Sequence, residues 1–283
     1  QSGHREFVWL IRKPKPALTP SRQMEFIRLV PVQLRVIEAL MLREILARFG
    51  RFQAGYLWAF FTPLAQVAVL YLVWILLKDK ESLNVPLVLF LMTGVLPFWT
   101  FRQTMRQGAT AVIKNKQLLN LPQITIFDVT IAHSVLEMLT MLMVFVIAVA
   151  STRLLGIVPH VQDPLGVFIG FALMWMIGSG MGAVFAGMSS RFPALPKFAQ
   201  PFLGRPLFFT SGLFFTAEMV PPRIREWLLY NPLLHVMEHI RNSFFFEMES
   251  PYGDLGYPVA IAVVLWAVGG AIMRINRAEL SRQ

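Results

Sequence analysis

The chain has 283 residues, of which 55% are hydrophobic and only 15% are charged. A soluble domain carries about 25% charged residues, so this composition excludes an ordinary soluble enzyme and indicates a membrane protein. A net charge of +10 would suggest a nucleic acid partner in a soluble protein, but in a membrane protein the positions of the charges matter more. Because there is no cysteine, a disulfide framework and a thiolate metal site are both excluded.

The N-terminal part of the chain predicts two cytoplasmic elements. Residues 1–30 are polar and basic, contain several prolines and lack a secretory signal, so we expect them to stay in the cytoplasm. Residues 31–53 predict an amphipathic helix that lies in the membrane interface. Its apolar stripe consists of Leu34, Ile37, Met41 and Ile45, with Arg35 and Arg43 elsewhere on the helix.

A transmembrane domain is predicted over residues 54–275, followed by a cytoplasmic tail at 276–283. A spanning helix needs about 20 largely uncharged residues. Six segments meet or approach this requirement, and the fold class is therefore an all-α polytopic membrane protein with six transmembrane helices. The segments are 55–77, 85–101, 129–152, 164–190, 198–217 and 255–273.

The segment 218–250, between the fifth and sixth spans, is too interrupted to cross a membrane. It contains both signs of charge and is broken at Asn231-Pro232. We interpret it as two short re-entrant helices at the outer face, which protein or water must cover.

The distribution of Lys and Arg predicts the orientation of these spans. With the N-terminus inside, nineteen of the 26 cations lie on the cytoplasmic side and six lie outside, while Arg205 falls within the fifth span. This roughly threefold excess places both termini in the cytoplasm.

Two ionisable residues are predicted to lie inside the membrane. Glu137 and Arg205 lie at similar depths, and a buried charge usually faces a partner or a wet cavity. We therefore predict a Glu137–Arg205 ion pair. The competing interpretation is that Arg205 faces a pathway and meets an anionic substrate.

Two motifs suggest chemistry that their surroundings do not favour. Gly178, Gly182 and Gly187 lie in an apolar run without a preceding strand, so they predict close helix packing in place of a dinucleotide loop. His235, Glu238 and His239 match the zinc pattern H-x-x-E-H, but no third ligand is evident, and we predict no metal site.

Aromatic residues crowd the first and fifth spans. Most suit the interfacial belt or packing, but flat rings could also line a conduit and stack on sugars. The candidate channel residues are Tyr56, Trp58, Tyr71, Trp74, Arg205 and Phe209.

The cytoplasmic loop 108–128 is a candidate docking site for a soluble partner. It contains a short amphipathic stretch that includes Lys114, Asn115, Gln117, Leu118 and Leu119. The chain has no phosphate-binding G-x-x-x-x-G-K-[ST] loop, so an ATP-driven transporter of this kind needs a separate motor subunit.

Two stretches resemble the ABC-2 type permeases, and within them the capsular polysaccharide and O-antigen exporters. One is Arg43–Arg51 with its continuation through Gly55, Trp58 and Pro63, which is similar to the family's basic helix and first span. The other is Asn231-Pro232-Leu233 with Glu238 and Arg241, which is similar to the family's NPL…E…R stretch and accounts for the zinc-like pattern without metal.

The resemblance implies a homodimer in the bacterial inner membrane, working with two ATP-binding cassette subunits that hold ATP and Mg²⁺. It implies that these subunits contact Arg43, Arg48 and the 108–128 loop. It further implies a lipid-linked polysaccharide as cargo, periplasmic and outer-membrane export components as partners, and the 218–250 segment as a gate. The candidate gate residues are Glu218, Arg223, Asn231, Pro232, Glu238 and Arg241.

Three alternatives stay open at the level of sequence. A different ABC-2 cargo, such as O-antigen, teichoic acid or a drug, would keep the same fold. A membrane-embedded metalloenzyme would need His235, Glu238 and His239 to bind a metal. A passive channel or scaffold would not stimulate an ATPase partner.

Overall fold

The computed structural model describes residues 22–49, 53–77, 85–115, 124–157, 160–189, 191–192 and 194–276. The chain divides into two compact units, residues 1–35 and residues 36–283. Helix α1 (Arg22–Phe49) contributes to both units, and it begins earlier and ends sooner than the helix expected at 31–53.

All regular structure in the described part of the chain is helical, which confirms the all-α prediction. The longest helices after α1 are α2 (Gln53–Leu77), α3 (Leu87–Lys114), α5 (Ile126–Ser151), α6 (Pro164–Met188) and α11 (Gly256–Ile275).

Among the described residues, three helical segments are long and apolar enough to cross a membrane: Ile126–Leu154, Pro164–Met188 and Gly256–Ile275. A shorter apolar stretch covers Phe60–Leu76 in α2. Helix α3 extends well beyond the expected end of its span at residue 101, because the polar sequence that follows Phe101 continues the helix as far as Lys114. The exact set of six spans therefore stays a prediction.

Helix α6 lies at the centre of the second unit, packed against α3, α11, α10 and α5. Glycines allow the close approach: a Cβ placed on Gly182 would lie 2.9 Å from the Cα of Gly108 in α3. On the other side, a Cβ on Gly187 would lie 2.8 Å from the side chain of Ile272 in α11. The predicted packing role of these glycines is confirmed, since any side chain there would push neighbouring helices apart.

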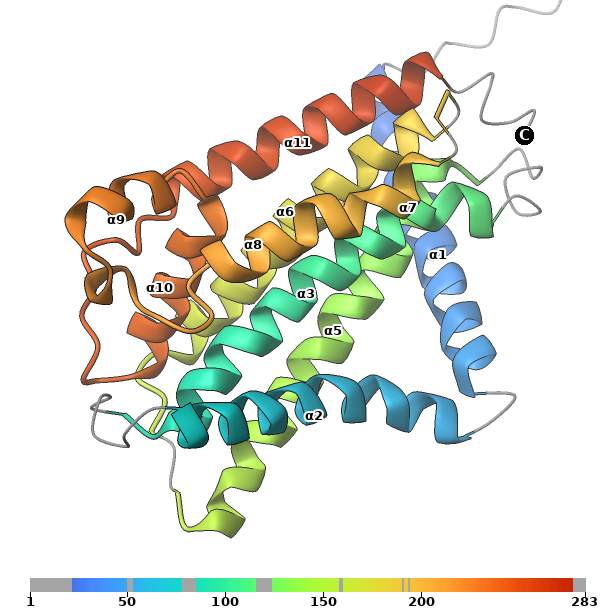
Figure 1. The fold of residues 1–283 in the computed structure, drawn as a ribbon. Coiled ribbons are helices and arrows are strands. Elements are labelled where there is room, and N and C mark those ends of the chain that lie inside the picture. The colour runs from blue at the N-terminus through green and yellow to red at the C-terminus, as the bar shows by residue number, and fades with distance from the viewer. Residues whose placement is uncertain are drawn as a thin grey trace, which may run out of the picture. The chain divides into compact units, whose positions relative to one another are not determined.

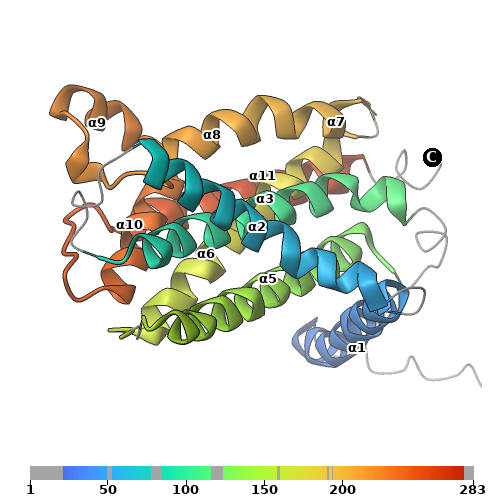
Figure 2. The ribbon, with the colours of Figure 1, turned by 60° about the horizontal axis from the view of Figure 1, so that its bottom comes forward.

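The long helices of the second unit run between two opposite ends of that unit (Figures 1 and 2). One end holds the last turns of α3, α6 and α11 and the start of α5. The other end holds α9 (Pro222–Leu228) and α10 (Pro232–Phe244). We call these the α5-start end and the α10 end.

The fifth predicted span, residues 198–217, is not one continuous α-helix. It consists of α7 (Leu195–Ala199), a π-helical turn, η3 (Gln200–Gly204), and α8 (Arg205–Thr210), followed by a bend as far as η4 (Ala217–Met219). Pro201 and Pro206 remove backbone donors that a regular helix needs, and Gly212 turns the chain with a φ of +75°. The segment 218–250 contains two short helices separated at Asn231, as the Asn-Pro pair predicted.

Candidate functional site

Helix α10 starts at the Asn-Pro pair of the motif. The Asn231 Oδ1 accepts a hydrogen bond from the Leu233 backbone N–H at 3.0 Å, which caps the helix. Pro232 suits the first helical position because no donor is needed there. The Asn231 Nδ2 also donates to the hydroxyls of Thr210 and Ser211, both at 3.0 Å, so the cap reaches the end of α8.

Glu238 and Arg241 hold the chain that follows α8. The Glu238 Oε1 accepts a hydrogen bond from the Ala217 backbone N–H at 2.9 Å. Arg241 donates from Nη1 to the Phe215 carbonyl at 2.8 Å and from Nη2 to the Leu213 carbonyl at 3.1 Å. We call Asn231, Glu238 and Arg241 the α10 clamp, because together they bind residues 210–217.

The two charged residues of the clamp are almost entirely buried. Glu238 and Arg241 are each 1% exposed, and the Arg241 guanidinium lies over the ring of Phe90 in α3. Burial lowers the pKa of Arg241 to about 10, and the charge of Glu238 opposes this shift. Arg241 therefore keeps its charge at neutral pH, and its carbonyl partners and the nearby carboxylate offset part of the cost of burial.

Helix α3 leaves room for the clamp at Gly94. A Cβ placed on Gly94 in α3 would lie 2.9 Å from the Leu213 carbonyl oxygen and 3.1 Å from the Arg241 Nη2. The apolar side of α10 enters the core through Leu234, Val236, Met237 and Ile240, all buried. One helix thus presents an apolar face to α3 and α6 and a polar face to the 210–217 segment.

A second set of polar residues lies where the last third of α3 faces the first half of α5, toward the α5-start end. The Gln107 Nε2 donates to the Glu137 Oε1 at 3.0 Å, and the Lys114 Nζ donates to the Gln107 Oε1 at 2.9 Å. Glu137 is only 4% exposed. A buried carboxylate is costly without such donors, so this chain of bonds stabilises it.

The same end connects to the second half of α1. The Asn115 Nδ2 lies 3.3 Å from the His133 Nε2, and the His133 Nδ1 lies 3.7 Å from a carboxylate oxygen of Glu44. Leu40 packs there against the small side chains of Ala111 and Ala132. We call Glu44, Gln107, Lys114, Asn115, His133 and Glu137 the α3–α5 polar cluster.

The predicted coupling residues lie partly in this cluster. Lys114 and Asn115 belong to it, while Gln117, Leu118 and Leu119 lie outside the described residues. Arg43 is exposed on α1; the side chain of Arg48 lies outside the described part. In the predicted apolar stripe, Ile37 and Met41 pack against the buried cluster that contains Leu40, Ala111 and Ala132, whereas Leu34 is exposed.

The predicted channel residues are mainly surface residues of the single chain. Trp58 and Tyr71 on α2 and Phe209 on α8 are exposed, as is Arg205. Trp74 packs instead against Phe90, with ring centroids 6.3 Å apart. The side chain of Tyr56 lies outside the described part.

The Glu137–Arg205 ion pair is not formed. Glu137 is buried beside Gln107 in the α3–α5 polar cluster, whereas the Arg205 side chain is exposed on α8. Equal depth in the membrane led to the prediction, but depth does not determine which face of a helix a side chain occupies.

The zinc-like pattern has a structural explanation. Within α10, the His235 Nε2 contacts the Leu229 carbonyl at 2.9 Å, and Glu238 belongs to the clamp. Burial lowers the pKa of His239, an effect that the Gly166 backbone and Asp163 oppose. No group of three or more His, Cys, Asp or Glu side chains in the described residues could hold a metal ion.

Sequence reasoning missed Gln107 and His133 as partners in the cluster. The available signal was the spacing of Gln107 and Lys114, which are seven residues apart and so share one face if α3 continues. It also missed the 210–217 segment as the partner of the motif, although Ser211-Gly212 is a typical turn sequence.

Comparison with known proteins identifies the family. The model of the ABC-2 type transporter family matches residues 35–245, a range that includes the α3–α5 polar cluster and the whole α10 clamp. The chain belongs to the ABC-2 type transporter family. The resemblance noted from the two motifs is thereby confirmed.

Relatives of this ABC-2 transporter act in polysaccharide export. It is 29% identical to the polysialic acid transport protein KpsM of Escherichia coli, over 86% of this chain and 94% of that protein. It is 28% identical to the capsule polysaccharide export inner-membrane protein CtrC of Neisseria meningitidis, over 86% and 91%. Similarity to the O-antigen export system permease protein RfbA of Klebsiella pneumoniae is lower, at 22% over 71% and 77%.

Proposed function

We propose that this chain is the transmembrane permease subunit of an ATP-driven exporter that moves a lipid-linked, acidic capsular polysaccharide out of the cytoplasm. The observation that carries the proposal is similarity to capsule export proteins along nearly their full length. One of these relatives is named for polysialic acid, an acidic polymer, which supports an acidic cargo.

The proposed location is the bacterial inner membrane, with six spans and both termini in the cytoplasm. The inner-membrane designation of CtrC and three long apolar helices support this location. The asymmetry of Lys and Arg supports the orientation. In this topology the α5-start end is cytoplasmic and the α10 end is outside.

Two copies of the chain are proposed to form the translocation path between them. The support is the uncovered aromatic surface of the single chain: Trp58, Phe61, Phe202 and Phe209 are each more than half exposed. Large exposed apolar areas mark contact with lipid, a partner or a ligand. Arg205, which is exposed on α8 as Phe209 is, would attract an acidic polymer.

The motor is proposed to be a pair of separate ATP-binding subunits, which hold ATP and Mg²⁺. They would contact the 108–128 loop and the exposed Arg43 of α1. The α3–α5 polar cluster supports this assignment, because its contacts join α3, which precedes the loop, to α5, which follows it. The contact between Glu44 and His133 adds α1 to the same cluster. Movement of the loop would thus reach a buried carboxylate.

The segment 218–250 is proposed to gate the outer exit. Because the α10 clamp binds residues 210–217, α10 and the end of α8 would move together. ATP-driven closure of the motor would shift the first and fifth spans and open the path. Such coupling requires that the two states differ in their contacts with the motor.

Co-purification tests the proposal directly. The chain is expressed together with an ATP-binding subunit of a capsule export system from the same genome, and we expect a complex with two copies of each subunit and ATPase activity. In cells without the chain, lipid-linked polymer should accumulate in the cytoplasm. A chain that purifies without an ATPase, and whose loss leaves the polymer on the cell surface, would refute the proposal and favour a passive channel or scaffold.

O-antigen is the second candidate cargo, and the similarity to RfbA favours it. Chemical analysis of the accumulated polymer separates the two. An acidic capsular polymer supports the first proposal, and an O-antigen chain attached to its lipid carrier supports the second.

A further inference from the structure

Two arginines lie one turn apart in the second half of α3. Arg102 is partly buried and Arg106 is exposed. Residues that are four apart on a helix share one face, so both side chains start from the same side of α3. We call them the α3 arginine pair. Like charges at this spacing repel each other, and an anion that contacts both would therefore be bound favourably.

The indole ring of Trp99 orients the first arginine of the pair. The guanidinium carbon of Arg102 lies 4.8 Å from the centroid of the Trp99 ring, as in a cation–π contact. The ring is itself held in place, because Trp99 is buried and its Nε1 donates a hydrogen bond to the Gln66 Oε1 in α2. Stacking uses the flat face of a guanidinium and leaves the N–H donors at its edge for an acceptor.

The chain does not neutralise the α3 arginine pair. In the part of the chain that the structure describes, neither Arg102 nor Arg106 makes a side-chain hydrogen bond or an ion pair. Other cations have acceptors, since Arg241 donates to two carbonyls and Lys114 donates to Gln107. An arginine that is partly withdrawn from water and has no acceptor favours an anionic ligand with several oxygen atoms.

The pair lies at the depth of the inner lipid headgroups in the topology proposed above. At about 1.5 Å per residue, Arg102 and Arg106 lie about 22 and 28 Å along α3 from its start at Leu87. The hydrocarbon core of a bilayer is about 30 Å thick, so both residues lie near its inner boundary. Arginine side chains extend from this depth to the headgroup layer, where the phosphates of lipids lie.

We propose that the α3 arginine pair binds the phosphodiester group of an anionic lipid in the inner leaflet. Arg102 donates to the phosphate oxygens from the free edge of its guanidinium, in the bidentate arrangement that suits phosphate, and Arg106 adds a second donor one turn further on. The acyl chains stay in the bilayer and hold the phosphate at this depth. The depth of the site rests on the proposed topology, whereas the binding does not.

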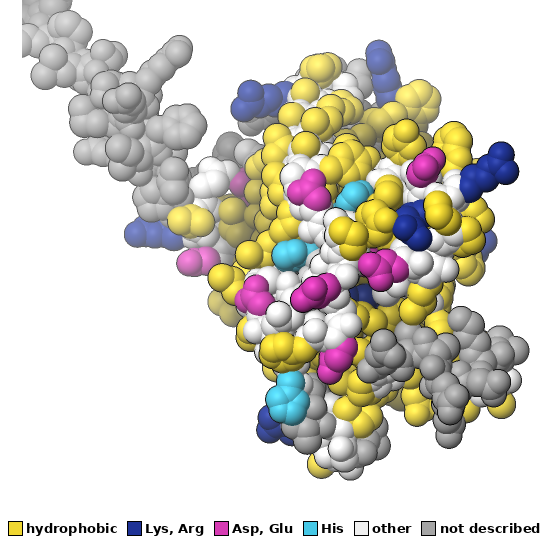
Figure 3. Space-filling model, turned by 90° about the vertical axis from the view of Figure 1, so that its left-hand side faces the viewer, with side chains coloured by type: hydrophobic (Ala, Val, Ile, Leu, Met, Phe, Trp, Pro, Cys, Tyr) yellow, Lys and Arg dark blue, Asp and Glu magenta, His cyan; other side chains and the backbone are white. Residues whose placement is uncertain are grey.

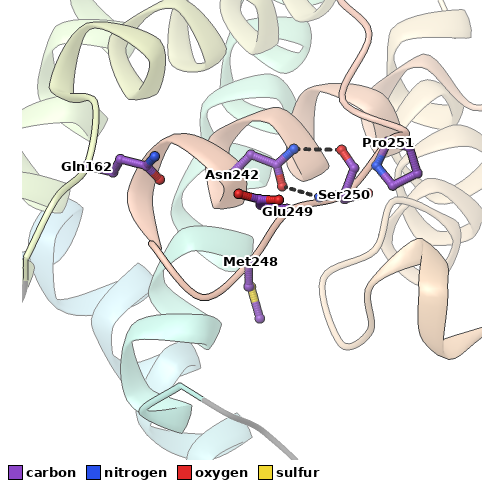
Figure 4. A pocket seen from close by; sticks show the side chains of 6 residues that line it. All are labelled: Gln162, Asn242, Met248, Glu249, Ser250 and Pro251. Carbon is purple, nitrogen blue, oxygen red and sulfur yellow. Dashed lines mark hydrogen bonds between the residues drawn. The ribbon is translucent and has the colours of Figure 1, made fainter.

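The hollow beside α10 does not suit a phosphate group. Figure 3 shows several acidic side chains on this face, where Glu218, Glu247 and Glu249 are exposed. Glu249 lines a hollow of about 420 Å³ together with Asn242 and Ser250, which are bonded to each other (Figure 4). Because carboxylates repel phosphate, we expect the anionic lipid at the α3 arginine pair and not in this hollow.

The test uses the full-length permease in detergent and native mass spectrometry, which counts the lipids that each chain retains. In a titration, the chain should bind phosphatidylglycerol saturably, with about one molecule at the site, and it should not bind diacylglycerol, which lacks the phosphate. The variant Arg102→Gln, Arg106→Gln should bind phosphatidylglycerol on the order of tenfold more weakly.

A second variant separates the guanidinium groups from their charge. Arg102→Lys, Arg106→Lys keeps both positive charges but loses the fork of donors, so it should also bind phosphatidylglycerol more weakly than the original chain. This variant still tests the site if the glutamine variant fails to fold. Binding equal to that of the original chain would overturn the proposed guanidinium contact.

The matched control is Arg274→Gln, which removes another exposed arginine at the α5-start end, from the last turn of α11. It should leave binding nearly unchanged. Equal weakening in this control and in the glutamine variant would show a general charge effect and overturn the proposal. Displacement of the lipid by millimolar inorganic phosphate, or by a soluble acidic polysaccharide, would overturn it in favour of a free phosphate or polymer site.

Thermal unfolding gives an independent measurement. Since a bound ligand stabilises the folded state, phosphatidylglycerol should raise the melting temperature of the original chain more than that of the glutamine variant. Equal increases in both would contradict the site. The assays contain neither an ATPase nor a polymer, so their failure leaves the proposed export function untouched, and a failure of export leaves the lipid site untouched.

Discussion

The guanidinium carbon of Arg241 lies 3.9 Å from the centroid of the Phe90 ring. This contact joins α10 to α3 at the same point where Arg241 binds the carbonyls of the 210–217 segment. Arg241 therefore connects α10, α3 and the 210–217 segment, and its loss should weaken the contacts among all three.

Replacing Arg241 with methionine should destabilise the protein strongly. Two carbonyls would lose their donor, and the buried Glu238 carboxylate would lose the cation near it. Leaving a buried charge uncompensated costs about 3–5 kcal/mol. Thermal unfolding in detergent measures the effect, with exposed Arg223→Met as the control. Equal melting temperatures for the two variants would contradict the clamp.

Two adjacent glycines in α11 give a matched test of helix packing. A Cβ on Gly269 would lie 2.8 Å from the Cβ of Ala183, whereas a Cβ on Gly270 would have nothing within 4 Å. Gly269→Ala should therefore lower the free energy of unfolding by about 1–3 kcal/mol. Gly270→Ala should be neutral or slightly stabilising, because alanine is the better helix former. Thermal unfolding of both variants provides the comparison, and the opposite order would refute this packing.

In the α3–α5 polar cluster, the hydrogen bond from Gln107 to Glu137 should contribute to the stability of the folded chain. Gln107→Leu removes a donor from a buried carboxylate and should cost about 1–3 kcal/mol of stability. The double variant Gln107→Leu, Glu137→Leu should recover much of this loss, since no buried charge remains. A double variant less stable than Gln107→Leu alone would mean that Glu137 is held mainly by other partners. Chemical unfolding of the purified variants measures each difference.

The proposed motor contact predicts a loss of export without a loss of folding. Changing Gln117, Leu118 and Leu119 together to alanine removes one polar and two apolar side chains of the proposed docking stretch. Polymer at the cell surface should disappear while the amount of protein in the membrane stays constant. Leu154→Ala, an exposed apolar change just after the end of α5, should leave export intact. Normal export in the triple variant would remove the coupling assignment.

Stability should fall at mildly acidic pH, partly because of His239. Burial lowers the pKa of His239 in the folded protein below its usual value of 6.5. As the pH falls through 6.5, the unfolded chain takes up a proton that the folded chain resists, so folding is disfavoured. His239→Gln should flatten the decrease in melting temperature between neutral and mildly acidic pH. His160→Gln, an exposed change, should retain it, and identical profiles for both variants would contradict this role.

Much of the architecture follows from patterns that one segment contains by itself. The apolar run at Pro164–Met188 predicted α6, its glycines predicted the close packing, and the Asn231-Pro232 pair predicted the start of α10. These features depend on local geometry, which is why sequence was sufficient for them.

The rest depends on which distant faces meet. Nothing local indicates that Glu137 faces Gln107 and not Arg205, because helix rotation is determined by packing across the whole unit. The same holds for Glu238 and Arg241, which resemble surface charges on an amphipathic helix until the 210–217 segment covers them. The continuation of α3 to Lys114 was missed because its charges suggested a loop.

The π-helical turn at Gln200–Gly204 has a mechanical consequence for the fifth segment. Beyond it, α8 is attached through residues 210–217 to α10, and α10 is anchored by its apolar side in the core. Bending stress applied at α7 should therefore concentrate in this one irregular turn, since α-helical hydrogen bonding resists deformation on either side. In the proposed function, a substitution that stiffens this turn would therefore impair the movement that carries closure of the proposed motor to the proposed gate.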